Sequence, residues 1–145
     1  LLGETSMLKL YRSRVIIFGV GGVGGYVAEG LARSGIGQID IVDNDTVALS
    51  NINRQIIATD ETVGIKKTQV AKDRLLSINP NLKVDVYDMF YLPENADEFN
   101  LAEYDYIVVN DDIATAVDDI ISVINSCRLQ LERQKHIINE VLEKC

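Results

Sequence analysis

The residues best suited to chemistry begin with a glycine-rich turn that reads Gly19-Val20-Gly21-Gly22-Val23-Gly24 and fits the pattern G-x-G-x-x-G. Gly19 permits a tight turn, Gly21 allows the backbone to approach a phosphate, and Gly24 allows a helix to pack closely on a strand. The helix that follows offers N–H groups and a positive dipole end to phosphate oxygens. We therefore expect Gly19, Gly21, Gly22 and Gly24 to bind a nucleotide; the alternative is a glycine-rich turn without a ligand.

An acidic residue follows this turn at the distance expected for a ribose contact. Asp43 lies 19 residues after Gly24, close to the spacing of about 20 residues at which a carboxylate accepts hydrogen bonds from ribose hydroxyls. Asp45 belongs to the same short acidic segment, and we expect both carboxylates to line the nucleotide site. The alternative is that Asp43 only ends a strand in a turn.

Cationic and amide side chains come next, and they distinguish between nucleotides. NAD, FAD, S-adenosylmethionine and ATP can all use such a turn, but hydride transfer needs no cations against the phosphates beyond the helix dipole. Asn51, Arg54 and Gln55 follow Asp43, and Lys67 comes at the start of the next expected helix. Arg offers a planar fork for phosphate oxygens, and Lys offers a mobile point charge. These groups favour ATP whose α-phosphorus is attacked while pyrophosphate leaves; a surface ion pair at Arg54 and a solvated Lys67 are the alternatives.

Alternating strands and helices must position these residues. Continuous apolar runs predict strands over 14–18, 38–42, 82–87 and 104–109. Apolar residues at helical spacing, or an opening proline, predict helices over 4–10, 23–34, 66–78 and 93–99. This alternation predicts an α/β fold, a Rossmann-like parallel sheet with helices on both faces.

The C-terminal stretch differs in composition from the rest. Residues 115–145 contain no Gly and no Pro and place apolar residues at helical spacing, which predicts a long helical stretch. We expect residues 1–112 to form the nucleotide-binding domain and 113–145 to be a helical segment of that domain, truncated or rearranged. Cys127 and Cys145 form no CxxC pair and are interpreted as ordinary thiols.

The overall composition is that of one globular domain. The chain has 145 residues, of which 47% are hydrophobic and 25% charged, a normal balance for a domain of this length. A formal net charge of −8 makes non-specific binding to nucleic acid unfavourable. No apolar run is long enough to cross a bilayer, and the first residues lack the pattern of a secretory signal. We expect a soluble cytoplasmic protein with no membrane contact.

Four segments together resemble the ubiquitin-activating-enzyme-like adenylating superfamily, which includes bacterial activators of sulfur-carrier proteins. These segments are residues 19–24, 43–45, 50–55 and 64–67. The Asn-x-x-Arg-Gln spacing of Asn51, Arg54 and Gln55 is far more specific than the glycines alone. Finer features are similar to the tRNA threonylcarbamoyladenosine dehydratases, and these lie in residues 28–37, 53–56, 78–80 and 88–90. That family uses ATP to activate a side-chain carboxylate in tRNA before a cyclic product closes.

The resemblance implies roles for residues already singled out. The glycines of the turn bind the ATP phosphates, and Asp43 holds the ribose. Asn51, Arg54 and Lys67 bind and polarise the phosphates. Arg54 in such enzymes also reaches the site of a neighbouring subunit, which implies a homodimer.

An aspartate after the fourth strand completes the expected site. Asp112 matches the family's residue that binds Mg²⁺ or the nucleotide, so Arg54, Lys67 and Asp112 are the expected catalytic residues and Asp112 the expected metal ligand. The family pattern here is Asp-Ala-x-Asp, and Val109 takes the place of the first aspartate. This departure makes nucleotide binding a stronger expectation than a complete catalytic cycle.

Three further functions stay open. An activator of a ubiquitin-like sulfur-carrier protein would attack with a protein C-terminus, but it usually has a paired-cysteine zinc site, and CxxC pairs are missing from this sequence. A nucleotide-binding dimerisation module without turnover agrees with the altered aspartate motif. An NAD-dependent oxidoreductase is disfavoured by Arg54 and Lys67.

Overall fold

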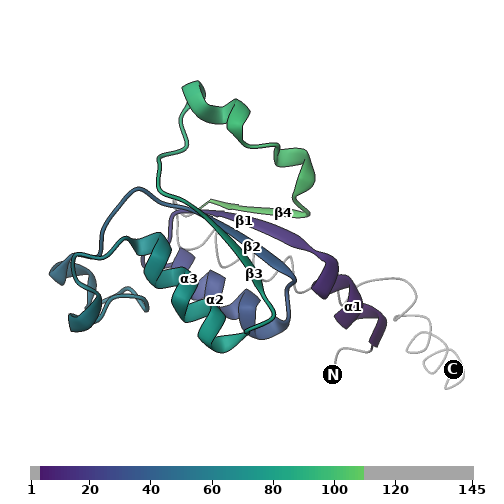
Figure 1. Ribbon diagram of the computed structural model, residues 1–145, viewed down its shortest axis with the longest axis horizontal. Coiled ribbons are helices and arrows are strands. Elements are labelled where there is room, and N and C mark those ends of the chain that lie inside the picture. The colour runs from purple at the N-terminus through teal and green to yellow at the C-terminus, as the bar shows by residue number, and fades with distance from the viewer. Residues whose placement is uncertain (1–3, 110–145) are drawn as a thin grey trace, which may run out of the picture.

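Four parallel strands form the centre of the structure, a computed structural model that describes residues 4–109 (Figure 1). The strands are β1 (Arg14–Phe18), β2 (Gln38–Val42), β3 (Lys83–Tyr87) and β4 (Tyr106–Val109). Their order in the sheet is β3-β2-β1-β4, and every pairing is parallel. The chain therefore runs outwards from β1 to β3 and then returns to the other side of β1. In open α/β sheets a ligand binds beside such a reversal, at the carboxyl ends of the strands.

One face of the sheet is covered by α2 (Gly24–Ser34) and α3 (Lys67–Ile78), which also pack against each other (Figure 1). Alternate residues of a strand point to the same face, and on this face they are apolar. The fully buried side chains that the two central strands place on this face are Val15, Ile17, Ile39 and Ile41. Each contributes roughly 1.5–3 kcal/mol relative to an exposed side chain, so this layer supplies the main core.

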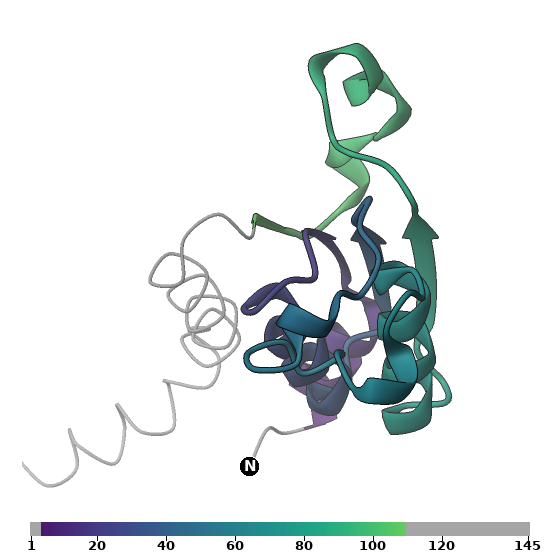
Figure 2. The same cartoon turned by 90° about the vertical axis from the view of Figure 1, so that its left-hand side faces the viewer.

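The opposite face is contacted by residues 88–105, the segment that joins β3 to β4 and that we call the crossover. It contains two short 3₁₀ helices, η3 (Pro93–Glu98) and η4 (Leu101–Glu103). Phe99 lies between them and is buried in a small second core that includes Ile16. Figure 2 shows the crossover rising past the carboxyl ends of the strands. The crossover therefore stands over the edge of the sheet where a ligand is expected.

The predicted α/β fold with a parallel sheet is confirmed, and each strand and helix expected within residues 4–109 is present. Element boundaries agree within two residues, and the differences in the last helix and the last strand of this range are informative. The helix expected over 93–99 is a 3₁₀ helix. The strand expected from residue 104 begins at Tyr106, because Tyr104 is the C-cap of η4 and its N–H donates to the oxygen of Leu101. Within the described range, α-helices cover one face of the sheet and 3₁₀ helices approach the other.

Several expectations concern residues outside the described range. The long C-terminal helical segment over 113–145, Asp112, Cys127 and Cys145 all lie there. Among residues 4–109, no helix is both long enough and apolar enough to cross a membrane.

Gly37 determines how closely the first helix, α1 (Glu4–Arg12), packs at the start of the sheet. A Cβ atom at Gly37 would lie 1.8 Å from the backbone oxygen of Tyr11, whereas one at Gly30 would have no atom within 4 Å. Gly37→Ala should therefore displace α1 and lower the free energy of unfolding by about 2–3 kcal/mol. Gly30→Ala, in the interior of α2, should raise it by about 0.5–1 kcal/mol. Urea unfolding measures the free energy of unfolding of both variants. If both substitutions shifted it in the same direction, this packing of α1 against Gly37 would be contradicted.

Candidate nucleotide-binding site

The glycine turn connects β1 to α2 and has the conformation that its glycines permit. Gly19 has a φ of +90°, in the left-handed region that disfavours side chains. Its N–H donates to the oxygen of Val42 at 2.8 Å, which ties the turn to the end of β2. The N-cap of α2 is Val23, whose side chain makes no capping hydrogen bond. The Val23 side chain therefore does not offset the positive end of this helix dipole.

Asp43 follows β2 and braces the same turn. One carboxylate oxygen accepts a hydrogen bond from the N–H of Val20 at 2.8 Å, and the other accepts from the N–H of Asp45 at 2.8 Å. A carboxylate has about four lone-pair sites, so Asp43 retains acceptor capacity beyond these two bonds. The arrangement places a carboxylate beside the glycine turn, where the sequence predicts a ribose contact.

Lys67 begins α3 and is directed at the same place. Its Nζ lies 2.7 Å from Oδ2 of Asp45, and its own N–H donates to the oxygen of Asp45 at 3.0 Å. The lysine side chain is 7% exposed and the aspartate side chain 57% exposed. The start of α3 is further anchored by Thr68, whose hydroxyl donates to Asp88. Lys67 is thus a nearly buried cation held in one position by a partner that water can reach.

These elements surround one pocket of about 600 Å³ at the carboxyl ends of β1, β2 and β4. Its polar side is lined by Gly19, Gly21, Asp43, Asn44, Asp45 and Lys67. Its apolar side is lined by Phe18, Val42, Met89, Phe90, Tyr91, Leu101, Ile107 and Val109. The pocket therefore joins a side lined by glycines and charged or polar side chains to a wide apolar wall.

The segment that contains Asn51, Arg54 and Gln55 lies beside the turn without lining this pocket. Asn51 is buried, and its Oδ1 accepts from the N–H of Ala48 at 2.9 Å. Gln55 is also buried, and its Oε1 has no hydrogen-bond partner within residues 4–109. The Asn51 side chain thus supports the local backbone.

Arg54 is exposed and stands next to the glycine turn. A Cβ atom on Gly22 would lie 3.9 Å from Cγ of Arg54. The guanidinium donates to the oxygen of Ser50 at 2.7 Å and to Oδ1 of Asn53 at 3.0 Å. Both partners are neutral, so no carboxylate in the described part of the chain forms a salt bridge with Arg54. The surface ion pair considered as an alternative for Arg54 is therefore not present in residues 4–109.

The structure brings five predicted site residues together around the pocket: Gly19, Gly21, Asp43, Asp45 and Lys67. Their contacts with a nucleotide stay predictions, as do those of Gly22, Gly24, Asn51, Arg54 and Gln55. Asp112 is outside the described residues. Among residues 4–109, no group of three or more His, Cys, Asp or Glu side chains could hold a metal ion.

Sequence reasoning missed the apolar wall that the crossover supplies. Four residues of the crossover line the pocket, and two of these, Phe90 and Tyr91, are 59% and 43% exposed. The available signal was the run of large apolar side chains from Met89 to Leu92 directly after a strand and Asp88. Exposed aromatic side chains in such a position often mark a binding surface.

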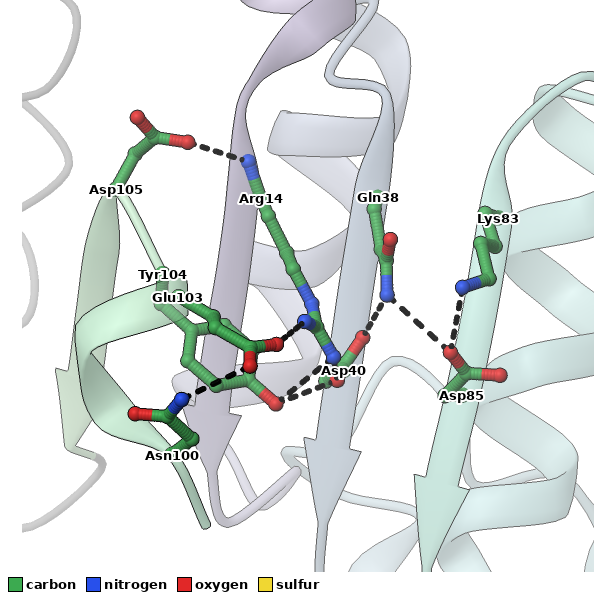
Figure 3. A network of polar contacts seen from close by, with 9 residues as sticks. All are labelled: Arg14, Gln38, Asp40, Lys83, Asp85, Asn100, Glu103, Tyr104 and Asp105. Atoms are coloured by element: carbon green, nitrogen blue, oxygen red, sulfur yellow. Dashed lines mark hydrogen bonds and ion pairs between the residues drawn. The ribbon is translucent and has the colours of Figure 1, made fainter.

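Sequence reasoning also missed a polar network on the crossover side of the sheet (Figure 3). Asp40 of β2 is fully buried. Its carboxylate accepts from Nη2 of Arg14 at 2.7 Å, from the hydroxyl of Tyr104 at 2.7 Å and from Nε2 of Gln38 at 2.8 Å. The available signal was an aspartate in the middle of an apolar strand, because a buried carboxylate requires partners.

Burial raises the pKa of the Tyr104 phenol well above its usual range, and the hydrogen bond to Asp40 and the charge of Asp40 raise it further. Arg14 opposes this shift and Tyr87 adds to it slightly. Since the folded pKa exceeds the unfolded one, the stabilisation is complete below about pH 10 and is lost as pH rises through the folded pKa. In an alkaline titration followed by tyrosinate absorbance at about 295 nm, Tyr104→Phe should therefore lower the signal only at the most alkaline pH values. A loss of signal near pH 10 would contradict the buried hydrogen bond.

Known families and proteins are similar to this chain over the residues that form the site. The model of the ThiF family matches residues 1–130. The tRNA threonylcarbamoyladenosine dehydratase of Haemophilus influenzae is 41% identical over 103 residues, which are 71% of this chain and 40% of the relative. The sulfur carrier protein adenylyltransferase of Thermus thermophilus is 37% identical over 107 residues, 74% of this chain and 39% of the relative. The chain thus spans about two fifths of the curated relatives it matches.

A solved structure with the same fold carries a nucleotide. E. coli tRNA N6-threonylcarbamoyladenosine dehydratase in complex with ATP superposes with a TM-score of 0.73 and 36% identity, covering 87% of this chain and 51% of that one. The family match covers most of the sequence, including the glycine turn, the pocket and the crossover. The chain therefore belongs to the ThiF family.

Proposed function

We propose that this protein binds ATP and uses it to adenylylate a carboxylate, in the cyclising dehydration of threonylcarbamoyladenosine in tRNA. The observation that carries the proposal is the composition of the pocket: the glycine turn, Asp43 and Lys67 form one side, and the apolar wall forms the other. The similar dehydratase in complex with ATP supports it.

Each part of ATP has a suitable surface in this pocket. The phosphates would lie at the glycine turn and the positive end of α2, with Lys67 as a nearby cation. The ribose hydroxyls would donate to Asp43, which retains acceptor capacity, and Asp45 would lie beside them. The planar adenine would lie against the apolar wall, which includes Phe90 and Tyr91. A nucleotide in this pose would replace Asp45 as the main partner of the lysine.

The chemical step is an exchange of one phosphoryl bond for another. A carboxylate oxygen of the acceptor attacks the α-phosphorus, the acyl adenylate forms, and pyrophosphate leaves with the electrons of the broken P–O bond. A carboxylate is ionised near pH 7, so no general base is needed. Lys67 and Arg54 would offset the charge that develops on the phosphate oxygens.

Mg²⁺, a homodimer and a cytoplasmic location belong to the same proposal. Mg²⁺ would neutralise phosphate charge, with Asp112 as its protein ligand. Mg²⁺ in nucleotide sites is usually bound by one or two carboxylates together with substrate phosphates, so a single aspartate and the ATP phosphates would suffice to hold it. In the homodimer, the exposed Arg54 would reach the site of the neighbouring subunit.

Two alternatives have specific support. The similarity to a sulfur carrier protein adenylyltransferase favours activation of a ubiquitin-like carrier protein in place of tRNA. A nucleotide-binding module without turnover is favoured by Val109, which lines the pocket at the end of β4 and is 47% exposed. This position supplies no carboxylate to the site.

Pyrophosphate exchange distinguishes these functions. The protein is incubated with ATP, Mg²⁺ and labelled pyrophosphate, with tRNA that contains threonylcarbamoyladenosine, with a sulfur-carrier protein, or with neither. Label should enter ATP only when the modified tRNA is present. Exchange that requires the carrier protein would support the first alternative, and ATP binding without exchange would support the second. A preference for NADH over ATP in a binding titration would contradict all three functions.

Arg54→Ala should lower turnover at least tenfold, or about 1.4 kcal/mol of transition-state stabilisation. Thermal stability should hardly change, because among residues 4–109 this exposed side chain bonds only to Ser50 and Asn53 of its own loop. Arg12→Ala, at the end of α1 and away from the pocket, is the control. Unchanged turnover in Arg54→Ala would remove this residue from the proposed machinery.

A further inference from the structure

Most residues of the crossover are exposed. Phe99 is its one buried residue among positions 88–105. The Phe99 ring packs against Phe18, Tyr87 and Tyr91 with centroids 5.2–5.9 Å apart. Yet this segment supplies four residues of the apolar wall of the pocket. The position of the wall therefore depends on how the two ends of the crossover are anchored.

The end of the crossover is anchored to β1 by several bonds on one arginine. The side chain of Arg14 donates to Glu103 at 2.9 Å and lies over the ring of Tyr104, with Cζ 4.3 Å from its centroid. The N–H of Arg14 donates to the carboxylate of Asp105 at 2.8 Å, and the N–H of Asp105 donates to the oxygen of Arg14 at 2.9 Å. Figure 3 shows these groups converging from β1 and from the chain that leads into β4.

Asp40 is the centre of this anchor. Its carboxylate oxygen Oδ2 accepts from both Arg14 and Tyr104 at 2.7 Å, while Gln38 donates to the other oxygen. Well-packed apolar side chains in such a place are often as stabilising as a buried ion pair or more so. A buried polar network instead makes one arrangement much better than its neighbours, because a shifted register leaves charges without partners.

A shift of register would have a direct effect on the pocket. Val15 of β1 pairs with Tyr106, and Phe18 pairs with Val109, a pocket residue. A slip of one residue would turn every side chain of β4 to the other face of the sheet. It would also move Leu101, three residues before Tyr104, away from the pocket.

We propose that Arg14, Asp40 and Tyr104 form a buried clamp that sets the register of the crossover and so positions the apolar wall for the base of ATP. The three are positioning residues, since none of them lines the pocket. This proposal rests on the proposed function for the identity of the ligand. The clamp itself is a property of the chain and can be tested without ATP.

The test compares Tyr104→Phe with Tyr11→Phe by hydrogen–deuterium exchange and by ATP binding. Tyr104→Phe keeps the ring beneath Arg14 and removes the hydroxyl that donates to Asp40. Tyr11 is 62% exposed on α1 and serves as the matched control. Amides of residues 88–101 should exchange roughly tenfold faster in Tyr104→Phe, while those of α2 and α3 keep their wild-type rates. Tyr11→Phe should change neither region.

Calorimetry and steady-state kinetics give the functional readout. In Tyr104→Phe the Kd and KM for ATP should rise roughly fivefold, and kcat at saturating ATP should change by less than about twofold, because the wall contacts the base and not the reacting phosphate. Unchanged amide exchange rates over residues 88–101, or an equal rise in the amide exchange rates of α2 and α3, would overturn the clamp. Faster amide exchange confined to residues 88–101 together with an unchanged ATP affinity would overturn the positioning role of the clamp. If the wild-type protein binds no ATP, the proposed function fails, and the exchange rates alone decide whether the clamp exists.

Discussion

Lys67→Ala is expected to weaken both ATP binding and turnover at least tenfold. Lys67 is the cation that lines the pocket, and its Nζ is held 2.7 Å from Asp45 at the polar side. A side chain that is only 7% exposed loses little further freedom when a phosphate binds, so its charge acts at close to full strength. A tenfold loss corresponds to about 1.4 kcal/mol. Calorimetric titration with ATP and pyrophosphate exchange measure the two effects.

Two further variants separate charge from fold. Lys72→Ala removes a lysine of the same helix that does not line the pocket, and it should bind ATP like the wild-type protein. Asp45→Asn should retain more affinity than Lys67→Ala, because it removes the partner of the lysine and leaves the cation. Urea unfolding should show a loss of no more than about 1 kcal/mol for Lys67→Ala, since its partner is exposed. Wild-type ATP affinity in Lys67→Ala would contradict the proposed phosphate position.

Asp40→Ala is expected to lower the free energy of unfolding by about 3 kcal/mol, the largest stability effect of the substitutions considered. Its carboxylate is fully buried and accepts three hydrogen bonds, two of them from Arg14 and Tyr104. Removing one partner of a buried pair leaves the other charge without compensation, which costs roughly 3–5 kcal/mol. The lower value applies because the Arg14 side chain is 24% exposed and can reach water. Chemical unfolding at pH 7 measures the change.

Asp85→Ala is the matched control for this substitution. Asp85 pairs with Asp40 in the register of β2 and β3 and therefore lies on the same face of the sheet. Its ion pair with Lys83 has an N–O distance of 3.3 Å, and the Lys83 and Asp85 side chains are 65% and 43% exposed. Exposed pairs contribute about 0–1 kcal/mol, so this variant should lose less than about 1 kcal/mol. Equal losses in the two variants would show that burial does not determine the importance of Asp40.

The comparison of Asp40 with Asp85 also illustrates what could be predicted from the sequence. The strands were predictable because each is a short apolar run that ends at Gly, Pro, Asn or Asp, and such signals lie within a few residues of one another. The contrast between the two aspartates was not predictable. Both stand in apolar strands, but one strand is central and the other lies at the edge of the described sheet.

The candidate site divides in the same way. The glycine turn and Asp43 were predictable together, because a strand–turn–helix–strand unit places the end of its second strand beside the turn of its first. The contributions of Met89, Phe90, Tyr91 and Leu101 were not, since they depend on how the crossover folds over the sheet. The burial of Asn51 and Gln55, predicted as nucleotide contacts, was equally a matter of tertiary packing.

The sequence by itself determined the succession of strands and helices along the chain. It also determined the glycine turn and the acidic and basic residues that follow it, because all of these are encoded by neighbouring residues. The tertiary structure alone decided which face each side chain occupies, which groups close the pocket, and that Arg14, Asp40 and Tyr104 meet. Parallel strands are joined by long connections, so residues that touch across the sheet lie far apart in the chain. The order of the strands within the sheet and their register set those contacts, and no local pattern of residues encodes that order or register.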